Sequence, residues 1–274
     1  MTTAISGSDP TSRESILPPV VTRQSIASRV GSLLGRQPAP PGRVRSDISE
    51  QDRAIVNQAF PYTMTGEARL LALIDAVRYC VRREIRGDFV ECGVWRGGSV
   101  LAMILALAGE DAEPRGIHLY DTFEGMTEPS EHDVSPIDPP ALAVWRETHR
   151  RGGRPWGELF DPHTFNEDAV RELLLATGYP VELLHFVAGR VEETIPAHIP
   201  DRLAVLRLDT DWYESTRHEL EHLYPRLVEG GVLIIDDYGH WQGCRRAVDE
   251  YFATEAPPLL LNRIDYTARI AVKL

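Results

Sequence analysis

The sequence predicts one large α/β domain built on an open sheet. In residues 203–238, two apolar strand-like runs flank one helical pattern, which is typical of a βαβ unit. In residues 87–108, a strand-like run is followed by a glycine-rich turn and an apolar helix. A chain of 274 residues, 43% of them hydrophobic, can bury the core that this fold requires.

The charge and the cysteines limit the partners and the compartment that we expect. A net charge of −12 argues against nucleic acid or an anionic membrane as a partner, because both require a basic surface. Cys80, Cys92 and Cys244 form no CxxC pair and cannot all pair within one chain, so a reducing cytoplasm is expected. No signal-peptide pattern begins the chain, and its longest apolar run, residues 100–108, is too short to span a bilayer.

The N-terminal stretch differs from the rest in composition. It is rich in Ser, Pro and Arg and carries six basic against two acidic residues, a charge of +4 that leaves −16 on the remainder. We predict a flexible basic extension over residues 1–46. Ile26, Val30, Leu33 and Leu34 have helical spacing, which leaves open a short amphipathic helix that docks on the body or on a partner subunit.

Two helical patterns follow from Asp47, separated by a break at residues 61–66. The second, residues 67–83, carries apolar side chains on one face. These are Leu70, Leu71, Ile74, Val77 and Val81. The break forms a turn at residues 63–66, which is either a lip over a ligand site or a plain N-terminal cap of the helix.

The glycine-rich turn after residue 87 has the features of a cofactor loop. Gly93 allows a sharp turn, and Gly97 and Gly98 remove side chains where a ligand approaches the main chain. The spacing is not G-x-G-x-x-G, which weakens a pyrophosphate site. The acid before the turn, Glu91, would repel phosphate but attract an ammonium group, which favours the methionine part of S-adenosylmethionine as the ligand.

The next strand-like run, residues 116–120, ends in Asp121, about one βα unit after the glycine turn. An acid at this place can accept hydrogen bonds from both ribose hydroxyls of a nucleoside, and Phe123 could then lie against the adenine. The alternative is that Asp121 caps a following helix.

Residues 126–165 interrupt the alternation with several prolines, a Gly152–Gly153 pair and aromatic residues that include Trp145, Trp156 and Phe160. An excursion of this length is more often a functional lid or an oligomer contact than an idle loop. We expect a lid-like insertion that influences substrate choice, although the aromatic residues could instead form a satellite hydrophobic cluster.

The remaining patterns complete the domain. We predict a helix over residues 166–177, a strand over 181–187, and a loop and short turn over 189–196. After residue 238 comes a helix, and then two strand-like runs, residues 259–264 and 267–273, which predict a hairpin.

Four acids follow the two strands of the βαβ unit. Asp209 and Asp211 alternate along an extended chain and should point the same way, while Asp236 and Asp237 follow the neighbouring strand. Ligands bind beyond the carboxyl ends of such strands, so the four carboxylates should converge. This crowding is costly unless a cation lies among them, and a hard divalent ion, Mg²⁺ first, explains it most simply. Otherwise these acids merely cap helices or face solvent.

Residues 218–222 match the H-E-x-x-H zinc motif. The apolar residues Leu220, Leu223 and Leu227 occupy one face of the predicted helix, whereas His218 and His222 occupy the opposite face. We therefore expect both histidines to be exposed to solvent. No third ligand is evident, so zinc chemistry is not favoured.

With these residues assembled, the chain resembles the macrocin O-methyltransferase family, enzymes that methylate sugar hydroxyls of macrolides and related natural products. The similarity covers roughly residues 63–251. The resemblance implies a class I methyltransferase domain over residues 47–274, with a Rossmann-like seven-stranded sheet, an antiparallel C-terminal hairpin and helices on both faces. It also implies S-adenosylmethionine as the methyl donor and Mg²⁺ as an obligatory ion.

The resemblance also implies roles for single residues. Asp209, Asp236 and Asp237 would hold the metal, and Asp211 would be the catalytic base. The implied cofactor-binding residues are Thr63, Met64, Glu91, Cys92, Gly93, Val94, Trp95, Gly97, Gly98, Ser99, Asp121, Thr122, Phe123 and Asp209. The acceptor would be a small-molecule glycoside or a nucleotide sugar, and a homo-oligomer in the cytoplasm is expected.

In this hypothesis Asp211 takes a proton from a sugar hydroxyl, and the oxygen then attacks the sulfonium methyl group in line. Two alternatives stay open. Asp209-Thr210-Asp211 also has the form of the D-x-D motif of metal-dependent glycosyltransferases, although that chemistry does not need the acid at Glu91. The chain could also be a non-catalytic binding protein on the methyltransferase fold, against which the four carboxylates argue.

Overall fold

A seven-stranded sheet runs through residues 47–274, the part of the chain that the computed structural model describes. Its strands are β1 (Asp88–Cys92), β2 (Ile117–Asp121), β3 (Leu184–Ala188), β4 (Leu203–Leu208), β5 (Leu227–Ile235), β6 (Asn262–Arg263) and β7 (Arg269–Val272). They lie in the order β3-β2-β1-β4-β5-β7-β6. The first five are parallel, and β7 is antiparallel to both β5 and β6. The predicted seven-stranded α/β sheet with an antiparallel C-terminal hairpin is therefore confirmed.

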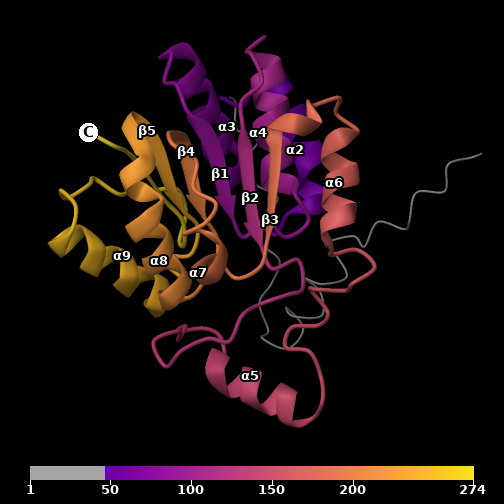
Figure 1. Cartoon of the computed structure of the whole chain (residues 1–274), viewed down its shortest axis with the longest axis vertical. Coiled ribbons are helices and arrows are strands. Elements are labelled where there is room, and N and C mark those ends of the chain that lie inside the picture. The colour runs from indigo at the N-terminus through magenta and orange to yellow at the C-terminus, as the bar shows by residue number, and fades with distance from the viewer. Residues whose placement is uncertain (1–46) are drawn as a thin grey trace, which may run out of the picture. The chain divides into compact units, whose positions relative to one another are not determined.

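The helices cover both faces of this sheet (Figure 1). They are α2 (Glu50–Ala59), α3 (Glu67–Arg82), α4 (Gly98–Gly109), α5 (Ala141–Arg150), α6 (Glu167–Leu175), α7 (Val191–Thr194), α8 (Tyr213–His222) and α9 (Gln242–Thr254), with short 3₁₀ turns η1 (Phe60–Tyr62), η2 (Val181–Leu183) and η3 (Tyr224–Arg226). One core joins the sheet to α2, α3, α4 and α6, and a second core joins the opposite face to α7, α8 and α9.

The helix boundaries follow from local signals in the sequence. The Ser49 hydroxyl accepts the main-chain N–H of Asp52 and begins α2, and the Asn166 side chain accepts that of Ala169 and begins α6. Along α3 the buried residues include Leu70, Ile74 and Val77, which are spaced as one helical face. These periodic and capped segments are the ones that the sequence predicts best.

Three segments differ from the prediction. The strand expected over residues 181–187 begins only at β3, because Pro180 leads into the 3₁₀ turn η2. The C-terminal hairpin forms, but β6 is only two residues long. The insertion at residues 126–165 contains one helix, α5, which stands beyond the carboxyl ends of the strands (Figure 1).

The expectations for residues 1–46, the flexible basic extension and its short amphipathic helix, lie outside the described residues. Among the helices of residues 47–274, none combines the length and the apolar character needed to cross a membrane.

Candidate functional site

A cavity of about 430 Å³ opens at the carboxyl ends of the parallel strands, where open α/β sheets bind their ligands. Most of the sequence-predicted site residues line it. These are Thr63, Met64, Glu91, Gly93, Val94, Trp95, Ser99, Asp121, Thr122, Asp209, Asp211, Asp236 and Asp237. The predicted residues Cys92, Gly97, Gly98 and Phe123 are not part of the lining. The four carboxylates that follow β4 and β5 therefore do converge on one cavity.

The lip of the cavity includes the turn before α3. Thr63 and Met64 line the cavity, and half of the Met64 side chain is exposed. The N-cap of α3 is Gly66, the last residue of this turn, and no side chain makes a capping hydrogen bond. The turn therefore both begins the helix and lines the cavity.

The turn after β1 depends on a close approach of two main chains. Gly93 has a φ of +84°, and a Cβ atom there would collide with the main-chain carbonyl group of Asp209. Trp95, at a φ of +48°, also lines the cavity. Its indole N–H donates to the carbonyl oxygen of Leu159 at 2.9 Å, so the inserted segment is attached to this turn.

Gly97 and Gly98 serve a purpose that the sequence analysis did not predict. A Cβ atom at Gly98 would lie 2.6 Å from the carbonyl oxygen of Tyr62, and one at Gly97 would lie 2.9 Å from Cγ1 of Val170. Protein atoms occupy the space beside these glycines, which allow η1 and α6 to pack on the start of α4. Neither glycine lines the cavity, and their contact with the cofactor stays a prediction.

Asp121 is held by main-chain N–H groups on both carboxyl oxygens. Oδ2 accepts from Val94 at 2.7 Å and from Trp95 at 2.9 Å, and Oδ1 accepts from Phe123 at 2.8 Å. No helix follows Asp121 directly, so the helix-cap alternative is wrong. Burial raises the pKa of Asp121, and the three N–H groups oppose this shift. Asp121 thus fixes the glycine turn, and its ribose contact stays a prediction.

Two of the predicted cofactor residues point into the hydrophobic cores. Phe123 is 8% exposed, packs in the core of α2, α3, α4 and α6, and lies 6.1 Å from the ring of Phe186. The adenine contact expected of Phe123 is therefore not supported by its position. Cys92 is fully buried in the core on the opposite face of the sheet.

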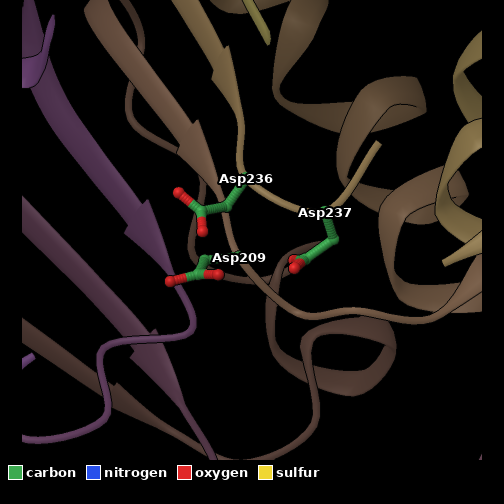
Figure 2. Close-up of side chains that lie close together, drawn as sticks. All are labelled: Asp209, Asp236 and Asp237. Atoms are coloured by element: carbon green, nitrogen blue, oxygen red, sulfur yellow. The ribbon is translucent and has the colours of Figure 1, made fainter. Parts of the chain in front are cut away.

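Three carboxyl groups lie side by side beyond β4 and β5 (Figure 2). Asp209, Asp236 and Asp237 each offer an oxygen atom, and these atoms lie within 4.8 Å of one another. Burial raises the pKa of Asp209 and of Asp237 well above the usual range, and neighbouring acids add to the shift. Oδ2 of Asp237 is buried without a hydrogen-bond partner. A set of hard oxygen donors with one unsatisfied atom fits a divalent cation such as Mg²⁺.

The acid cluster already contains a cation that the sequence analysis missed. Arg207, inside β4, is fully buried, and its guanidinium group donates to Glu91 at 2.5 Å, Asp236 at 2.6 Å and Asp209 at 2.8 Å. It also donates to the Thr65 hydroxyl at 2.8 Å. Burial, opposed by Arg207, raises the pKa of Glu91 to about 7. Glu91 was expected to attract an ammonium group of the ligand, but it already pairs with the Arg207 guanidinium group of the protein.

A second arginine reaches the cluster from α3. Arg69 forms ion pairs with Asp236 and, at 3.2 Å, with Asp265 before β7. We inferred from the sequence that a metal ion is the simplest way to relieve the crowded acids. Two arginines also relieve it, so crowding alone does not require a metal, and only the free donors of Asp209 and Asp237 still favour one.

Asp211 is a fourth acid of the same cavity, and its side chain interacts with that of Asp237. β4 ends at Leu208, and Asp211 has a φ of +66°, so the chain does not continue extended as predicted. Its Oδ1 accepts the indole N–H of Trp241 at 2.8 Å. Burial, opposed by this hydrogen bond, raises the pKa of Asp211 to about 7. A carboxylate with this pKa can accept a proton near neutral pH.

The inserted segment and the loops after β5 and β6 close the remaining wall of the cavity. The sequence analysis did not assign these lining residues to the site: Thr65, Arg69, Gly125, Met126, Thr127, Phe160, Thr210, His240, Trp241, Tyr266 and Thr267. The indole N–H of Trp212 donates to the carbonyl oxygen of Thr127 at 3.1 Å, a second attachment of the segment. Phe160 also packs edge-on against Phe165, as expected of a satellite hydrophobic cluster.

The H-E-x-x-H sequence on α8 forms no metal site. His218 and His222 are stacked with their ring centroids 4.1 Å apart and are partly buried, so the expectation that they face solvent is wrong. Within residues 47–274, the one group of three potential ligands is formed by the three aspartates beyond β4 and β5. The acid of the motif, Glu219, is completely buried.

The strand order, the antiparallel β7 and the glycine turn at the cavity define a class I methyltransferase fold. The solved structure of the O-methyltransferase NovP shares it, with a TM-score of 0.65 and 32% identity over 77% of this chain and 82% of that one. A calicheamicin methyltransferase, with a TM-score of 0.61 and 20% identity, covers 97% of this chain and 99% of its own and agrees in fold. The chain belongs to the macrocin O-methyltransferase (TylF) family, whose model matches residues 35–272.

The curated relatives are also O-methyltransferases. Demethyldecarbamoylnovobiocin O-methyltransferase of Streptomyces niveus is 34% identical over 70% of this chain and 68% of its own length. A tetracenomycin-C rhamnosyl 4'-O-methyltransferase of Streptomyces olivaceus is 38% identical over 69% of this chain and 67% of its own length. The chain is therefore an S-adenosylmethionine-dependent O-methyltransferase. The glycosyltransferase alternative and the non-catalytic alternative are wrong.

Proposed function

We propose that this enzyme is magnesium-dependent and methylates a sugar hydroxyl of a glycosylated natural product, with Asp211 as the base. The observation that carries the proposal is the position of Asp211 in one cavity with the three clustered carboxylates and the glycine turn. A donor site, a cation site and a base within one cavity of about 430 Å³ are the parts that this reaction requires.

Asp209, Asp236 and Asp237 would hold Mg²⁺. A bound Mg²⁺ supplies positive charge that lowers the pKa of a nearby acceptor hydroxyl group. Arg207 fixes the direction of Asp209 and Asp236, because it donates to both carboxyl groups.

Asp211 takes the proton of the acceptor hydroxyl group. Trp241 stabilises the ionised carboxylate and fixes its direction by donating to Oδ1 of Asp211. The hydroxyl oxygen bonds to the methyl carbon of the donor as the bond from that carbon to sulfur breaks. The sulfonium becomes a neutral thioether and the proton stays on Asp211, so charge and atoms balance.

The glycine turn and its surroundings would bind the donor. In this proposal Gly93, Val94, Trp95 and Ser99 contact the methionine part, and Asp121 accepts hydrogen bonds from the ribose. Thr63, Met64, Glu91 and Thr122 complete the wall. Phe123 and Cys92 would contribute only by packing in the hydrophobic cores next to the turn, since neither lines the cavity.

The charge of the cavity favours a neutral glycoside over a nucleotide sugar. Among its described lining residues, Arg69 is the one arginine or lysine, and it is already paired with Asp236 and Asp265. Six carboxyl groups share the lining with it: Glu91, Asp121, Asp209, Asp211, Asp236 and Asp237. The diphosphate of a nucleotide sugar would therefore meet no unpaired arginine or lysine among these lining residues. The relatives from Streptomyces, named for a novobiocin and a tetracenomycin intermediate, agree with a glycoside acceptor.

Methyl transfer and metal binding in two variants test the assignment of the acids. Asp211→Asn should lower kcat by about 10²- to 10⁴-fold because the base is lost, while calorimetry shows unchanged binding of Mg²⁺ and S-adenosylmethionine. Asp236→Asn should weaken Mg²⁺ binding. Asp249→Asn, an exposed carboxylate on α9, is the control. Full activity of Asp211→Asn, or activity of the wild type that survives EDTA, would contradict the proposal.

A panel of acceptors separates the two substrate classes. Neutral glycosides with free vicinal sugar hydroxyl groups should accept the methyl group from labelled donor, whereas the matching nucleoside-diphosphate sugars should not. Methylation of only the nucleotide sugars would contradict the glycoside proposal. The homo-oligomeric state stays a prediction, which sedimentation of the full chain tests.

A further inference from the structure

A buried glutamate on α8 contacts the turn that carries two of the functional acids. Glu219 is completely buried, and its Oε1 accepts the hydroxyl group of Thr210 at 2.9 Å. Thr210 is the single residue between Asp209 and Asp211. Thr210 therefore links the Glu219 side chain to the turn that carries both aspartates.

The surroundings of Glu219 favour its neutral form. The Cys92 thiol hydrogen-bonds the carboxyl group, and the strongest charges acting on it include the acids Glu192 and Asp209. Within residues 47–274 Glu219 forms no ion pair, and its Oε2 has no hydrogen-bond partner. Burial raises the pKa of Glu219 well above its usual range. A neutral carboxylic acid costs far less to bury here than a carboxylate.

The turn that Glu219 supports is held in an unusual conformation. Asp211 adopts a positive φ of +66°, which is rare for a residue with a side chain and persists only where the surroundings impose it. The carbonyl oxygen of Thr210 accepts the main-chain N–H of Trp212 at 2.8 Å and the hydroxyl group of Ser215 at 3.3 Å. Glu219 adds the only hydrogen bond to the Thr210 side chain among the described residues. Thr210 is thus fixed at both its main chain and its side chain.

We propose that Glu219 is a positioning residue for methyl transfer, which sets the places of the Asp209 and Asp211 carboxylates through Thr210. The inference rests on the proposed roles of these two aspartates. Because the Thr210 hydroxyl group needs only an acceptor, an uncharged carbonyl oxygen at position 219 should serve as well as the acid does.

Four variants and a control test this role in the full chain. Glu219→Leu removes the acceptor, Thr210→Val removes the donor, and the double variant removes both. Glu219→Gln keeps a carbonyl oxygen in place of Oε1. The control is Thr216→Val, which removes a hydroxyl group from the same buried region of α8 but not from the Thr210 turn. The readouts are kcat, Mg²⁺ binding and S-adenosylmethionine binding, with the melting temperature of each variant.

We expect Glu219→Leu and Thr210→Val each to lower kcat and Mg²⁺ affinity by about 10- to 100-fold, with the binding of S-adenosylmethionine unchanged. The double variant should lose no more than either single variant, because both remove the same hydrogen bond. Glu219→Gln and Thr216→Val should stay close to the wild type. A general loss of structure would lower the melting temperature and donor binding as well.

Wild-type kcat and Mg²⁺ affinity in Thr210→Val would overturn the inference, even if Glu219→Leu fails to fold. Equal losses in Glu219→Gln and Glu219→Leu would also overturn it, because the amide retains the acceptor. The proposed function fails separately, if Asp211→Asn is fully active. An inactive Asp211→Asn beside an unaffected Thr210→Val overturns the role of Glu219 alone.

Discussion

Asp121 and Asp236 both lie at strand ends in one cavity, but they are neutralised in opposite ways. Asp121 accepts three main-chain N–H groups, from residues no more than 27 positions away. Asp236 is 2% exposed and pairs with two guanidinium groups, those of Arg207 and Arg69, which lie 29 and 167 positions away. The first arrangement follows from how the main chain turns. The second depends on the identity of two distant side chains.

This difference separates two parts of the site. The donor half is the glycine turn that Asp121 holds, and the acid half is the group of carboxyl groups that Arg207 and Arg69 hold. Main-chain N–H groups are kept in every substitution except one by proline, so the Asp121 turn tolerates changes of the side chains around it. A buried guanidinium group pairs with several carboxyl groups at once, so a single substitution removes an ion-pair partner from all of them. The two halves should therefore respond to mutation in different ways.

Removal of Arg207 should produce the largest loss of stability, because it removes ion pairs within the acid half. Arg207→Leu leaves Glu91 buried without its partner and Asp236 with Arg69 alone, and it should lower the free energy of unfolding by about 3–5 kcal/mol. Urea denaturation followed by circular dichroism measures this change. Arg82→Leu, which removes an exposed ion pair with Glu110, is the control and should unfold like the wild type. A stability loss no larger than that of the control would show that Arg207 does not hold the cluster.

Loss of the Asp121 carboxylate should have a smaller and graded effect on the donor half. Asp121→Ala leaves three N–H groups without their acceptor and should cost about 1–3 kcal/mol of stability, with weaker binding of S-adenosylmethionine. Asp121→Asn keeps one acceptor oxygen and should fall between the wild type and Asp121→Ala. Thermal denaturation and calorimetry measure both effects. Identical behaviour of the two variants would contradict the role of the N–H contacts.

Arg69 lies in the acid half, where its positive charge should repel a bound Mg²⁺ ion. Arg69→Gln should therefore bind Mg²⁺ more tightly, by about tenfold or roughly 1.4 kcal/mol, as measured by titration calorimetry. Arg78→Gln, on the same helix but paired with Asp52, should leave Mg²⁺ binding unchanged. Weaker Mg²⁺ binding in Arg69→Gln would show that Arg69 assists the site instead of competing with it.

The smallest expected effect concerns the pH dependence set by Trp241. Asp211 must be ionised to accept a proton, so kcat/KM falls as the pH drops through the pKa of Asp211, which burial raises to about 7 in the metal-free enzyme. A bound cation lowers this midpoint. The indole hydrogen bond also lowers it, so Trp241→Phe should move the acid limb upward by about half a pH unit. A downward shift in the kcat/KM profile would contradict Asp211 as the base.

The parts of the site that the sequence predicted follow from local patterns. The glycine turn, the acid ending β2 and the acids after β4 and β5 all adjoin apolar runs whose strand character is readable. Their meeting in one cavity then follows from the rule that parallel strands end at the same edge. The seven-stranded sheet and its antiparallel end were predictable on these grounds, together with the family resemblance.

The missed parts depend on contacts distant in sequence or on side-chain direction. Arg207 did carry a signal, since a single arginine within the buried run of β4 must find anions nearby. Arg69 carried none, because it is one of several charged residues on an amphipathic helix. The left-handed turn at Asp211 and the inward course of Phe123 arise from packing that no local pattern encodes.

The tryptophan attachments of the inserted segment have an evolutionary consequence. Trp95 and Trp212, on the body of the enzyme, donate to carbonyl oxygens of the main chain at Leu159 and Thr127. Every amino acid supplies such an oxygen, so these anchors place no demand on which side chains the segment carries. The side chains of residues 126–165 can therefore change in sequence while the two points that attach this segment to the body of the enzyme persist.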